Sequence, residues 1–172
     1  GTAVLQGASY ARGTLIIQYE QDAVSRIDRR DMSGRKLGSI NLPGLGSAGI
    51  STDPDSTNAF LSYTSYNEPR TIYRCDVATG KLGGIWARPD VPVDPDTVVV
   101  RRLWAKSKDG TRVPMFVVHR KDLDPSTPHP TLLYGYGGFN ISLTPSFIGT
   151  NFPFYDSGGI YVVANLRGGG EF

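Results

Sequence analysis

The sequence is poor in the residues that most often carry redox, metal or acid–base chemistry. Its single cysteine, Cys75, has no partner for an internal disulfide or a Cys-x-x-Cys motif, so we expect a small buried strand residue there. The two histidines, His119 at a predicted strand end and His129 between two prolines, are expected at the surface and not as catalytic bases. We therefore predict no metal site and no cofactor.

Charge of one sign and long apolar runs are missing as well. The 18 Lys and Arg residues nearly balance the 16 Asp and Glu residues, and no basic run stands out, so nucleic acid is not an expected partner. The mixed-sign run at 26–31 is predicted to be a solvated strand face. No apolar stretch approaches the ~18 residues of a membrane span, and no signal-peptide pattern is present. We expect no membrane contact and a cytoplasmic location, with the periplasm as the alternative if a signal peptide belongs to a preceding segment.

The sequence does contain a series of short β-branched and aromatic runs separated by turn residues, in a chain with 39% apolar and 20% charged residues. This composition is typical of a folded globular protein, and the runs predict antiparallel strands. The first six predicted strands are 14–19, 23–30, 36–42, 59–64, 71–76 and 81–86.

The first half of the sequence repeats itself after 45 positions. Seven residues of the fourteen-residue segment 27–40 recur at 72–85, among them Arg29 at Arg74 and Asp31 at Asp76. A period of about 40–50 residues built from short strands is typical of β-propeller blades. Two unrelated hairpins that share a similar turn remain the alternative.

A proline-rich connector separates the two halves of the chain. Three prolines lie within residues 88–95, which predicts an extended, semi-rigid segment and a domain boundary. Helical structure beyond it is limited to about two turns, because Gly149 and Pro153 interrupt the candidate segment. The predicted elements there are strands at 97–106 and 111–119, a strand that enters Tyr134, the short helical segment within 144–157 and a last strand at 159–166.

Two of these predicted strands are apolar enough to be buried, and both run into glycine-rich loops. Glycines at 135, 137 and 138 surround Tyr136 and precede Phe139, and three more follow Arg167. Glycine permits positive φ and lets backbone N–H groups approach a ligand closely. α/β-Hydrolases place such a loop after their third strand, where it aims a donor at the oxyanion. An ordinary strand-to-loop exit remains the alternative, whereas a phosphate-binding loop is disfavoured because no Gly-Lys-Ser/Thr follows.

Longer strings of residues narrow the choice of family. They are Tyr-Gly-Tyr-Gly-Gly-Phe-Asn-Ile-Ser at 134–142, Thr144-Pro145, Ala-Asn-Leu-Arg-Gly-Gly-Gly-Glu at 164–171, Ser-Lys-Asp-Gly-Thr-Arg-Val-Pro-Met-Phe at 107–116 and Thr-Ile-Tyr-Arg-Cys-Asp at 71–76. With these strings the chain resembles the prolyl oligopeptidase family, serine peptidases that cut short peptides after proline. The resemblance is specific from about Ser107 onward and looser over the N-terminal third. Phe172 stands where the family usually has tyrosine.

The resemblance implies a mixed β and α/β fold, in which antiparallel β-propeller blades precede the first strands of an α/β-hydrolase domain. Residues 1–90 would form about two blades and residues 91–172 the N-terminal part of the catalytic domain, so the chain looks like a fragment of a peptidase. The implied activity is that of a serine-type endopeptidase that hydrolyses the bond on the carboxyl side of proline in short peptides. The implied partners are such proline-containing peptides and the rest of its own chain.

The same resemblance assigns two site residues. Tyr136 is the expected oxyanion donor, because its phenolic O–H can point at the oxygen on which negative charge develops. Phe139 is the expected wall of the proline pocket, since an aromatic face grips an apolar ring without leaving a polar group unpaired. From the residues alone, core packing beside a glycine loop is the alternative for both, and Arg167 is expected to be structural.

The catalytic triad is expected outside this sequence. No Gly-x-Ser-x-Gly nucleophile motif occurs, and the family places its nucleophile, acid and base after the Arg-Gly-Gly-Gly-Glu stretch. We therefore expect the isolated chain to be inactive. Two other functions stay open: an esterase or lipase of the same fold, whose loop would more typically read His-Gly-Gly-Gly, and a non-catalytic propeller-type interaction fragment.

Overall fold

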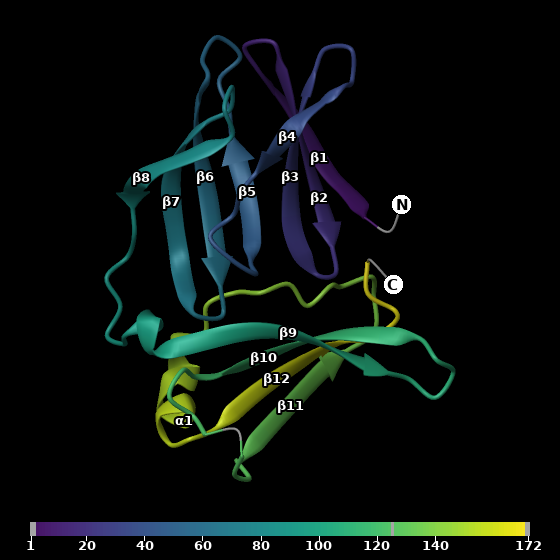
Figure 1. Ribbon diagram of the computed structural model, residues 1–172, viewed down its shortest axis with the longest axis vertical. Coiled ribbons are helices and arrows are strands. Elements are labelled where there is room, and N and C mark those ends of the chain that lie inside the picture. The colour runs from purple at the N-terminus through teal and green to yellow at the C-terminus, as the bar shows by residue number, and fades with distance from the viewer. Residues whose placement is uncertain (1–2, 125, 171–172) are drawn as a thin grey trace.

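The computed structural model describes residues 3–124 and 126–170 and contains three four-stranded sheets. Two of them stand side by side in the upper part of Figure 1, and the third lies beneath them with its strands running across. Each upper sheet is a simple antiparallel meander, because successive strands are joined by short turns. We call the first of these sheets blade one and the second blade two.

The two blades have the same strand order and are built from strands of similar length. Blade one consists of β1 (Val4–Ala11), β2 (Thr14–Gln21), β3 (Val24–Asp31) and β4 (Lys36–Ile40). Blade two consists of β5 (Ser47–Ser51), β6 (Asn58–Ser65), β7 (Glu68–Asp76) and β8 (Lys81–Ala87). The 45-residue repeat therefore corresponds to two copies of one four-stranded unit.

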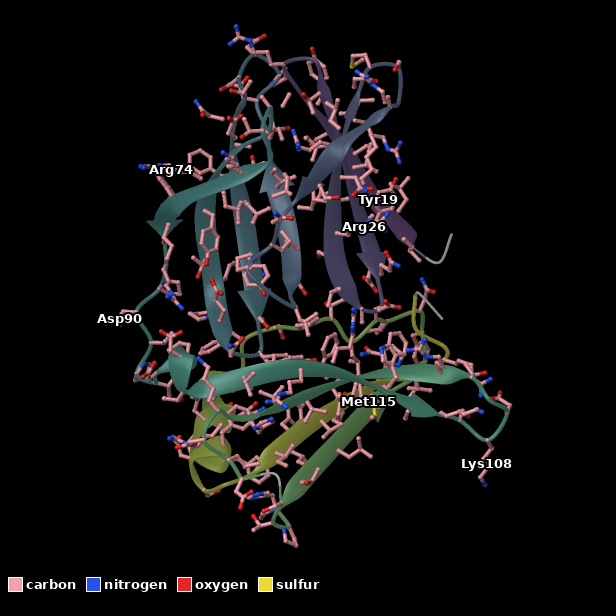
Figure 2. The ribbon with its side chains drawn as sticks, in the orientation of Figure 1. Tyr19, Arg26, Arg74, Asp90, Lys108 and Met115 are labelled. Atoms are coloured by element: carbon pink, nitrogen blue, oxygen red, sulfur yellow. The ribbon has the colours of Figure 1, made fainter. Side chains whose placement is uncertain are left out.

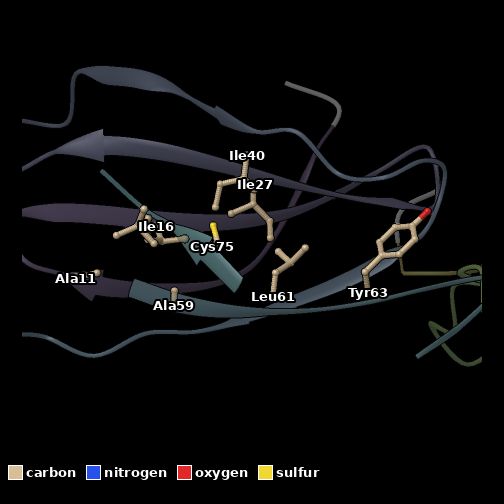
Figure 3. Packing of buried hydrophobic residues seen from close by; sticks show 9 residues of the cluster. Ala11, Ile16, Ile27, Ile40, Ala59, Leu61, Tyr63 and Cys75 are labelled. Carbon is tan, nitrogen blue, oxygen red and sulfur yellow. The ribbon is translucent and has the colours of Figure 1, made fainter. Parts of the chain in front are cut away.

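A hydrophobic core fills the space between the two blades (Figure 3). The facing side chains come from alternate positions of the central strands, as the period of two in a strand requires, and include Ile16, Ile27, Leu61 and Cys75. Cys75 is buried as predicted, and that burial raises the pKa of its thiol to about 11. The thiol is therefore protonated and unreactive at neutral pH.

The mixed-sign run at 26–31 is not the solvated face that its charges predicted. Asp28 and Arg29 are both buried, each with partners that compensate for lost hydration. The Asp28 carboxylate accepts hydrogen bonds from Ser39 Oγ at 2.8 Å and Lys36 Nζ at 3.1 Å. The Arg26 guanidinium at the edge of this run lies over the Tyr19 ring, 4.7 Å from its centroid (Figure 2).

Two strands of the blades, β1 and β5, were not predicted. The β5 sequence Ser-Ala-Gly-Ile-Ser contains a single β-branched apolar residue, so its own propensity for strand is weak. It is a strand because its backbone pairs along β6, from Ser47 opposite Thr64 to Ser51 opposite Phe60. The tertiary pairing has decided the conformation of this segment.

The third sheet has the strand order β11-β12-β10-β9 and mixes parallel with antiparallel pairing. After the one-turn η1 (Pro95–Thr97), β9 (Val98–Lys106) and β10 (Arg112–Arg120) form an antiparallel hairpin. β11 (Thr131–Tyr136) and β12 (Ile160–Asn165) are parallel to each other, and the crossover between them carries η2 (Gly149–Asn151) and α1 (Phe152–Asp156). The limit of about two helical turns that the sequence predicted is confirmed.

The two apolar strands that precede the glycine loops differ in burial. β12 lies between β10 and β11 and is buried, as predicted. β11 was also predicted to be buried, and this is wrong, because it is the edge strand and its side chains Leu132, Leu133 and Tyr134 are exposed. Its position at the edge, which its composition does not reveal, explains the difference.

The third sheet and the blades share a second hydrophobic core. Tyr66, in the turn between β6 and β7, packs on Phe116 of β10 and Tyr161 of β12, with ring centroids 5.6 and 6.2 Å apart. Polar contacts cross the same boundary, including a 2.7 Å hydrogen bond from Ser47 Oγ to the carbonyl oxygen of Pro145. The segment that follows β11 therefore runs along the base of the blades, as Figure 1 shows.

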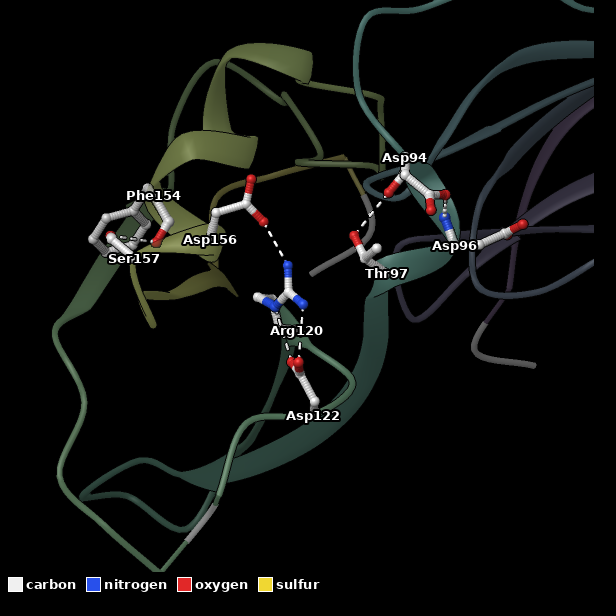
Figure 4. A network of polar contacts seen from close by, with 8 residues as sticks. All are labelled: Asp94, Asp96, Thr97, Arg120, Asp122, Phe154, Asp156 and Ser157. Atoms are coloured by element: carbon white, nitrogen blue, oxygen red, sulfur yellow. Dashed lines mark hydrogen bonds and ion pairs between the residues drawn. The ribbon is translucent and has the colours of Figure 1, made fainter.

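A small ion-pair network fixes α1 to the sheet (Figure 4). Arg120, the last residue of β10, contacts Asp122 and Asp156, at 2.9 and 2.7 Å respectively. All three side chains are partly or largely exposed, so we expect the network to position α1 more than to stabilise the whole fold. In the described part of the chain, no helix is long and apolar enough to cross a membrane.

Candidate functional site

Tyr136 and Asn165 lie side by side at the ends of two parallel strands. Tyr136 is the last residue of β11 and Asn165 the last residue of β12, and they are paired in the register of the sheet. The carboxyl ends of neighbouring parallel strands are where ligands commonly bind in sheets that contain helical crossovers. Each strand then runs directly into one of the two glycine-rich loops, so both loops are brought to the same edge of the sheet.

The two glycine-rich loops contact each other backbone to backbone. A Cβ atom added at Gly137 would lie 2.5 Å from the carbonyl oxygen of Arg167, and one at Gly168 would lie 2.5 Å from that of Gly137. The backbone N–H of Asn140 donates a 3.2 Å hydrogen bond to the carbonyl oxygen of Gly168. Close approach is therefore the reason for glycine at 137, whereas Gly168 combines close approach with a positive φ of 98°.

Positive φ, the other property that glycine was expected to supply, lies elsewhere in the first loop. Phe139 and Asn140 have φ of 52° and 58°, whereas none of the three glycines at 135, 137 and 138 has a positive φ. Left-handed backbone is uncommon for a residue as bulky as phenylalanine. Two consecutive residues of this kind turn the chain sharply just after the glycines, and the 3.1 Å hydrogen bond from Ile141 N to Gly138 O closes the turn.

A small cavity of about 10 Å³ lies beneath the loops. Its lining includes Tyr136, Ser142 and Asn165 from the third sheet and its loops, and Ala23 from the turn between β2 and β3 of blade one. The Asn165 side chain is 5% exposed, and both of its amide atoms are buried without a hydrogen-bond partner among the described residues. Such a group is uncommon in folded proteins, and here it lies in a lining that also contains the apolar residues Ile141, Leu143 and Leu166. Its volume is comparable to about one water molecule and far below that of a peptide side chain.

The two predicted site residues lie in different surroundings. Tyr136 is half-buried and lines the cavity, and a Cβ added at Gly138 would be 3.9 Å from its hydroxyl oxygen. Phe139 is 90% exposed and does not line the cavity. The structure thus brings Tyr136 together with Asn165 and leaves the Phe139 ring open to solvent, three residues further along the same loop.

Both histidines lie toward the opposite edge of the sheet, where β11 and β12 begin. His129 precedes β11 and contacts the carbonyl oxygen of Asp124 at 2.7 Å, whereas His119 is near the end of β10 that pairs with the start of β12. Tyr136 and Asn165 mark the opposite ends of β11 and β12. Neither histidine therefore serves as a base for Tyr136 in this arrangement.

Arg167 connects the second glycine loop to the hairpin between β9 and β10. Its Nη1 atom contacts Oδ2 of Asp109, and backbone hydrogen bonding from Thr111 followed by this contact holds the pKa of Asp109 well below its usual range. This contact supports a structural role for Arg167. Glu171 and Phe172 lie outside the described residues. Within the residues that are described, no group of three or more metal-ligating side chains occurs.

Sequence reasoning missed two residues of this site. Asn165 could have been identified from the sequence, because it is a polar residue directly after the apolar run Tyr-Val-Val-Ala. Ala23 carries none, since it was predicted as the first residue of a strand and lies in a turn with φ of 58°. Two larger hollows, of about 550 and 520 Å³, are lined by other residues, on blade two and beside α1 respectively.

Repeated four-stranded antiparallel sheets that pack face to face define part of a β-propeller. The family model described as the prolyl oligopeptidase N-terminal beta-propeller domain matches residues 2–86, which covers both blades almost completely. The chain belongs to the prolyl oligopeptidase family.

The relatives of the chain are peptidases. A prolyl endopeptidase of Elizabethkingia meningoseptica is 37% identical over 161 residues, which are 93% of this chain and 23% of that protein. A dipeptidyl aminopeptidase BI of Pseudoxanthomonas mexicana is 36% identical over 128 residues, 73% of this chain and 18% of that protein. The chain thus spans about a quarter or less of the length of these relatives.

Solved structures of the family have the same arrangement of the three sheets. A prolyl endopeptidase matches with a TM-score of 0.85 and 44% identity, over 99% of this chain and 25% of that one. Prolyl oligopeptidase B from Galerina marginata matches with a TM-score of 0.88 and 31% identity, over the same shares. Both matches include residues beyond the family model's segment 2–86, so the likeness extends through the third sheet.

Proposed function

We propose that the chain is part of a serine-type endopeptidase that hydrolyses peptide bonds on the carboxyl side of proline in short peptides. The observation that carries the proposal is the position of Tyr136 at the carboxyl end of a parallel strand, beside a loop whose glycines permit close backbone approach. Prolyl endopeptidases among the relatives, one of them 44% identical over nearly the whole chain, support the proposed substrate class.

The third sheet is proposed to be the start of an α/β-hydrolase domain. Counted from β9, the strand that carries Tyr136 is the third, and α/β-hydrolases take an oxyanion-hole donor from the loop after their third strand. The parallel pair β11 and β12, joined by a crossover that contains α1, supports this assignment. Residues 1–90 would then be a partial propeller of about two blades and residues 91–172 the beginning of the catalytic domain.

Tyr136 is proposed to donate its phenolic hydrogen to the oxyanion of the tetrahedral intermediate. A donor of this kind acts only when negative charge develops on the carbonyl oxygen, so it lowers the barrier without tightening substrate binding. One such donor contributes roughly 3–4 kcal/mol in hydrolases of related chemistry. The half-buried position of the side chain supports this role, because partial burial restricts the ring.

Phe139 is proposed to form one wall of the pocket for proline. Its ring is 90% exposed and lies on the same loop as Tyr136, so it offers an apolar face beside the oxyanion donor. Proline is apolar and has no N–H of its own, which suits a surface without hydrogen-bonding groups. The other walls and the nucleophile, acid and base would be contributed by segments beyond this sequence.

The proposal is tested by comparing the isolated chain with a protein of the relatives' length that contains this sequence, here called the full-length protein. The full-length protein is expected to hydrolyse a succinyl-Gly-Pro chromogenic amide with a higher kcat/KM than the matched succinyl-Gly-Ala amide. The isolated chain is expected to hydrolyse neither, because positioning groups without a nucleophile cannot form an acyl-enzyme. Equal rates on the two amides, or cleavage of simple esters alone, would show that the substrate class is wrong.

A further inference from the structure

Asn165 has a buried side-chain amide without a partner, which no other residue that the structure describes has. It is 5% exposed, and neither Oδ1 nor Nδ2 takes part in a hydrogen bond with the described residues. Arg29 differs, because its Nε alone is buried without a partner while its Nη1 donates to the carbonyl oxygen of Val77 at 3.1 Å. A buried donor and a buried acceptor that both stay unpaired are costly, so we expect a partner for this amide.

The position of Asn165 in β12 makes a polar side chain there unexpected. Side chains two positions apart on a strand share a face, so Asn165 continues the row of Tyr161 and Val163. Tyr161 and Val163 are buried in the core that the third sheet shares with the blades, and Ala23 of blade one belongs to the same core. Packing alone would favour an apolar residue at the end of this row, because an amide loses its hydration there. The amide therefore needs a polar partner within the cavity that it lines.

The size and lining of that cavity match one water molecule. Its volume is about 10 Å³, at the lower limit for a single water. None of the described residues that line it is charged, so an ion would have no counter-charge there. The lining residues with polar side chains are Tyr136, Ser142 and Asn165, and an internal water typically makes about three hydrogen bonds. The amide offers both a donor and an acceptor, and each hydroxyl can do either.

Tyr136 and Ser142 stand at the two ends of the first glycine loop, and both line the cavity. Tyr136 is paired with Asn165 in the register of the parallel strands, so the two residues are neighbours on the sheet. Beyond Tyr136 the chain turns, with a 3.1 Å hydrogen bond from Ile141 N to Gly138 O, and then returns to the cavity at Ser142. A molecule bound in the cavity therefore lies beneath both ends of the loop.

We propose that Asn165 is a positioning residue for Tyr136 and that it acts through one water molecule bound in this cavity. In this arrangement the Asn165 amide and the water form a hydrogen-bonded unit that also contacts the Ser142 hydroxyl. The unit holds both ends of the glycine loop against β12. The proposal rests on the proposed role of Tyr136 as the oxyanion donor, and it adds the groups that fix the position of that donor.

Asn165 affects the reaction only through Tyr136, because it is too deeply buried to touch a substrate. An oxyanion donor acts over a narrow range of distance from the developing charge, so its contribution falls steeply when the loop shifts. The donor interaction is made only in the transition state, so a misplaced Tyr136 lowers kcat and leaves KM nearly unchanged. A residue that served packing alone would change the Tm without this division between kcat and KM.

The kinetic test uses substitutions in the full-length protein. Asn165→Leu keeps the approximate size of the side chain and removes both hydrogen-bonding groups. It is expected to lower kcat for the Gly-Pro amide about 10-fold and to leave KM within about 2-fold of the wild type. Asn165→Ser restores a donor and an acceptor in a smaller side chain, so it is expected to recover most of the lost kcat. An Asn165→Ser protein as slow as Asn165→Leu would assign the loss to packing and overturn the proposal.

Thr71→Val is the matched control for a loss of stability. Thr71 is fully buried in blade two, and its hydroxyl donates a 2.9 Å hydrogen bond to the carbonyl oxygen of Pro69. The substitution keeps the shape of the side chain and removes that bond, so it is expected to lower the Tm and to leave kcat unchanged. A loss of kcat in Thr71→Val as large as that in Asn165→Leu would show that reduced stability alone explains the effect, which would overturn the proposal.

A double-mutant cycle separates the positioning role from the proposed function. Asn165→Leu is expected to have no further effect on kcat in a Tyr136→Phe protein, because the hydroxyl that Asn165 positions is gone. Equal losses in both backgrounds would show that Asn165 acts independently of Tyr136 and would overturn the proposal. If Tyr136→Phe alone leaves kcat unchanged, the proposed oxyanion donor itself is wrong, and the positioning role is lost with it.

A high-resolution crystal structure of the full-length protein tests the water site without any measurement of activity. One water molecule is expected within hydrogen-bond distance of the Asn165 amide and of the Ser142 hydroxyl. A dry cavity, or an amide that bonds directly to a segment beyond this sequence, would overturn the proposal whatever the kinetics show. The same structure decides the proposal if Asn165→Leu fails to fold.

Discussion

Tyr66 of blade two lies against Phe116 of β10 with the ring centroids 5.6 Å apart, so the propeller part and the third sheet share one hydrophobic core. Ala23, from blade one, belongs to the same core, so both blades reach the sheet that carries Tyr136. The turns at the base of the blades are therefore part of the support of the candidate site, and the small cavity beneath the glycine loops is lined from both sides.

Replacing Tyr66 by alanine is expected to destabilise the isolated chain by roughly 3–5 kcal/mol, as is typical for the loss of a buried aromatic ring. Tyr66→Phe keeps the ring contacts and is the matched control, with an expected loss below about 1.5 kcal/mol. Urea unfolding monitored by circular dichroism measures both. Equal stabilities of the alanine and phenylalanine variants would mean that the shared core contributes little.

Stability is expected to depend on pH through Asp28. Burial alone raises the pKa of a carboxyl, but hydrogen bonds from Ser39 and Lys36 and the charge of Arg26 outweigh it, so the pKa of Asp28 lies below its usual value. A lowered folded-state pKa means that the ionised group stabilises the fold above the unfolded-state pKa of about 3.9, and that this contribution is lost as pH falls through the folded-state value. Asp28→Asn is therefore expected to lower stability by roughly 1–3 kcal/mol at pH 7.

The decisive measurement is the difference in Tm between wild type and Asp28→Asn as a function of pH. This difference is expected to be constant from neutral pH to about pH 5 and to shrink as pH falls below about 4. Asp90→Asn, at an exposed position in the connector, is the control and should follow the wild type throughout. A difference that stays the same down to pH 3 would show that the Asp28 charge does not contribute.

The glycine loops offer a matched pair of substitutions. Gly137→Ala is expected to be strongly destabilising, because its Cβ would lie 2.5 Å from the carbonyl oxygen of Arg167 and backbone must move to relieve the overlap. Gly138→Ala is expected to be tolerated or to stabilise the fold by up to about 1 kcal/mol. Its Cβ would lie 3.9 Å from the nearest atoms, which is an ordinary van der Waals contact, and alanine lowers the conformational entropy of the unfolded chain. In thermal unfolding, the Tm of Gly138→Ala should therefore be well above the Tm of Gly137→Ala.

The sequence was informative where a local pattern and the final environment agree. Short β-branched and aromatic runs between turn residues predicted β2, β3, β6 and β7, and each of these strands has one face in a core. The repeat at 45 positions was visible because identical residues recur, such as Ile27 at Ile72 and Asp31 at Asp76, and it corresponds to two sheets with the same strand order. The family's strings of residues added what such patterns cannot, the assignment of Tyr136 and Phe139, which stays a prediction.

The sequence was uninformative where the environment is made by distant residues. The burial of Arg29 depends on carbonyl groups 48 and 49 positions away, so its charge alone predicted a solvated face. β5 has weak strand propensity and exists because β6 pairs with it. Asn165 lies beside Tyr136 only because β12 pairs parallel to β11, and no spacing in the sequence specifies that register.

In the full-length protein, Tyr136→Phe is expected to lower kcat/KM for the Gly-Pro amide by the equivalent of roughly 2–4 kcal/mol while leaving Tm nearly unchanged. The hydroxyl is needed only where negative charge develops, so the loss should fall on kcat. The ratio of kcat/KM for the Gly-Pro and Gly-Ala amides should stay constant, because the oxyanion is common to both. A raised KM with an unchanged kcat would instead assign Tyr136 to substrate binding.

Phe139→Ala is expected to behave in the opposite way in the same protein. Its ring would contact proline in both the ground state and the transition state, so the substitution should mainly raise KM and reduce the preference for Gly-Pro over Gly-Ala. The loss is expected to be roughly 1–3 kcal/mol, the range for removing apolar contact from a pocket. Because the ring is 90% exposed in the isolated chain, Tm of that chain should not change, which separates a binding role from a packing role. If Tyr136→Phe alters the proline preference and Phe139→Ala does not, the two roles are exchanged.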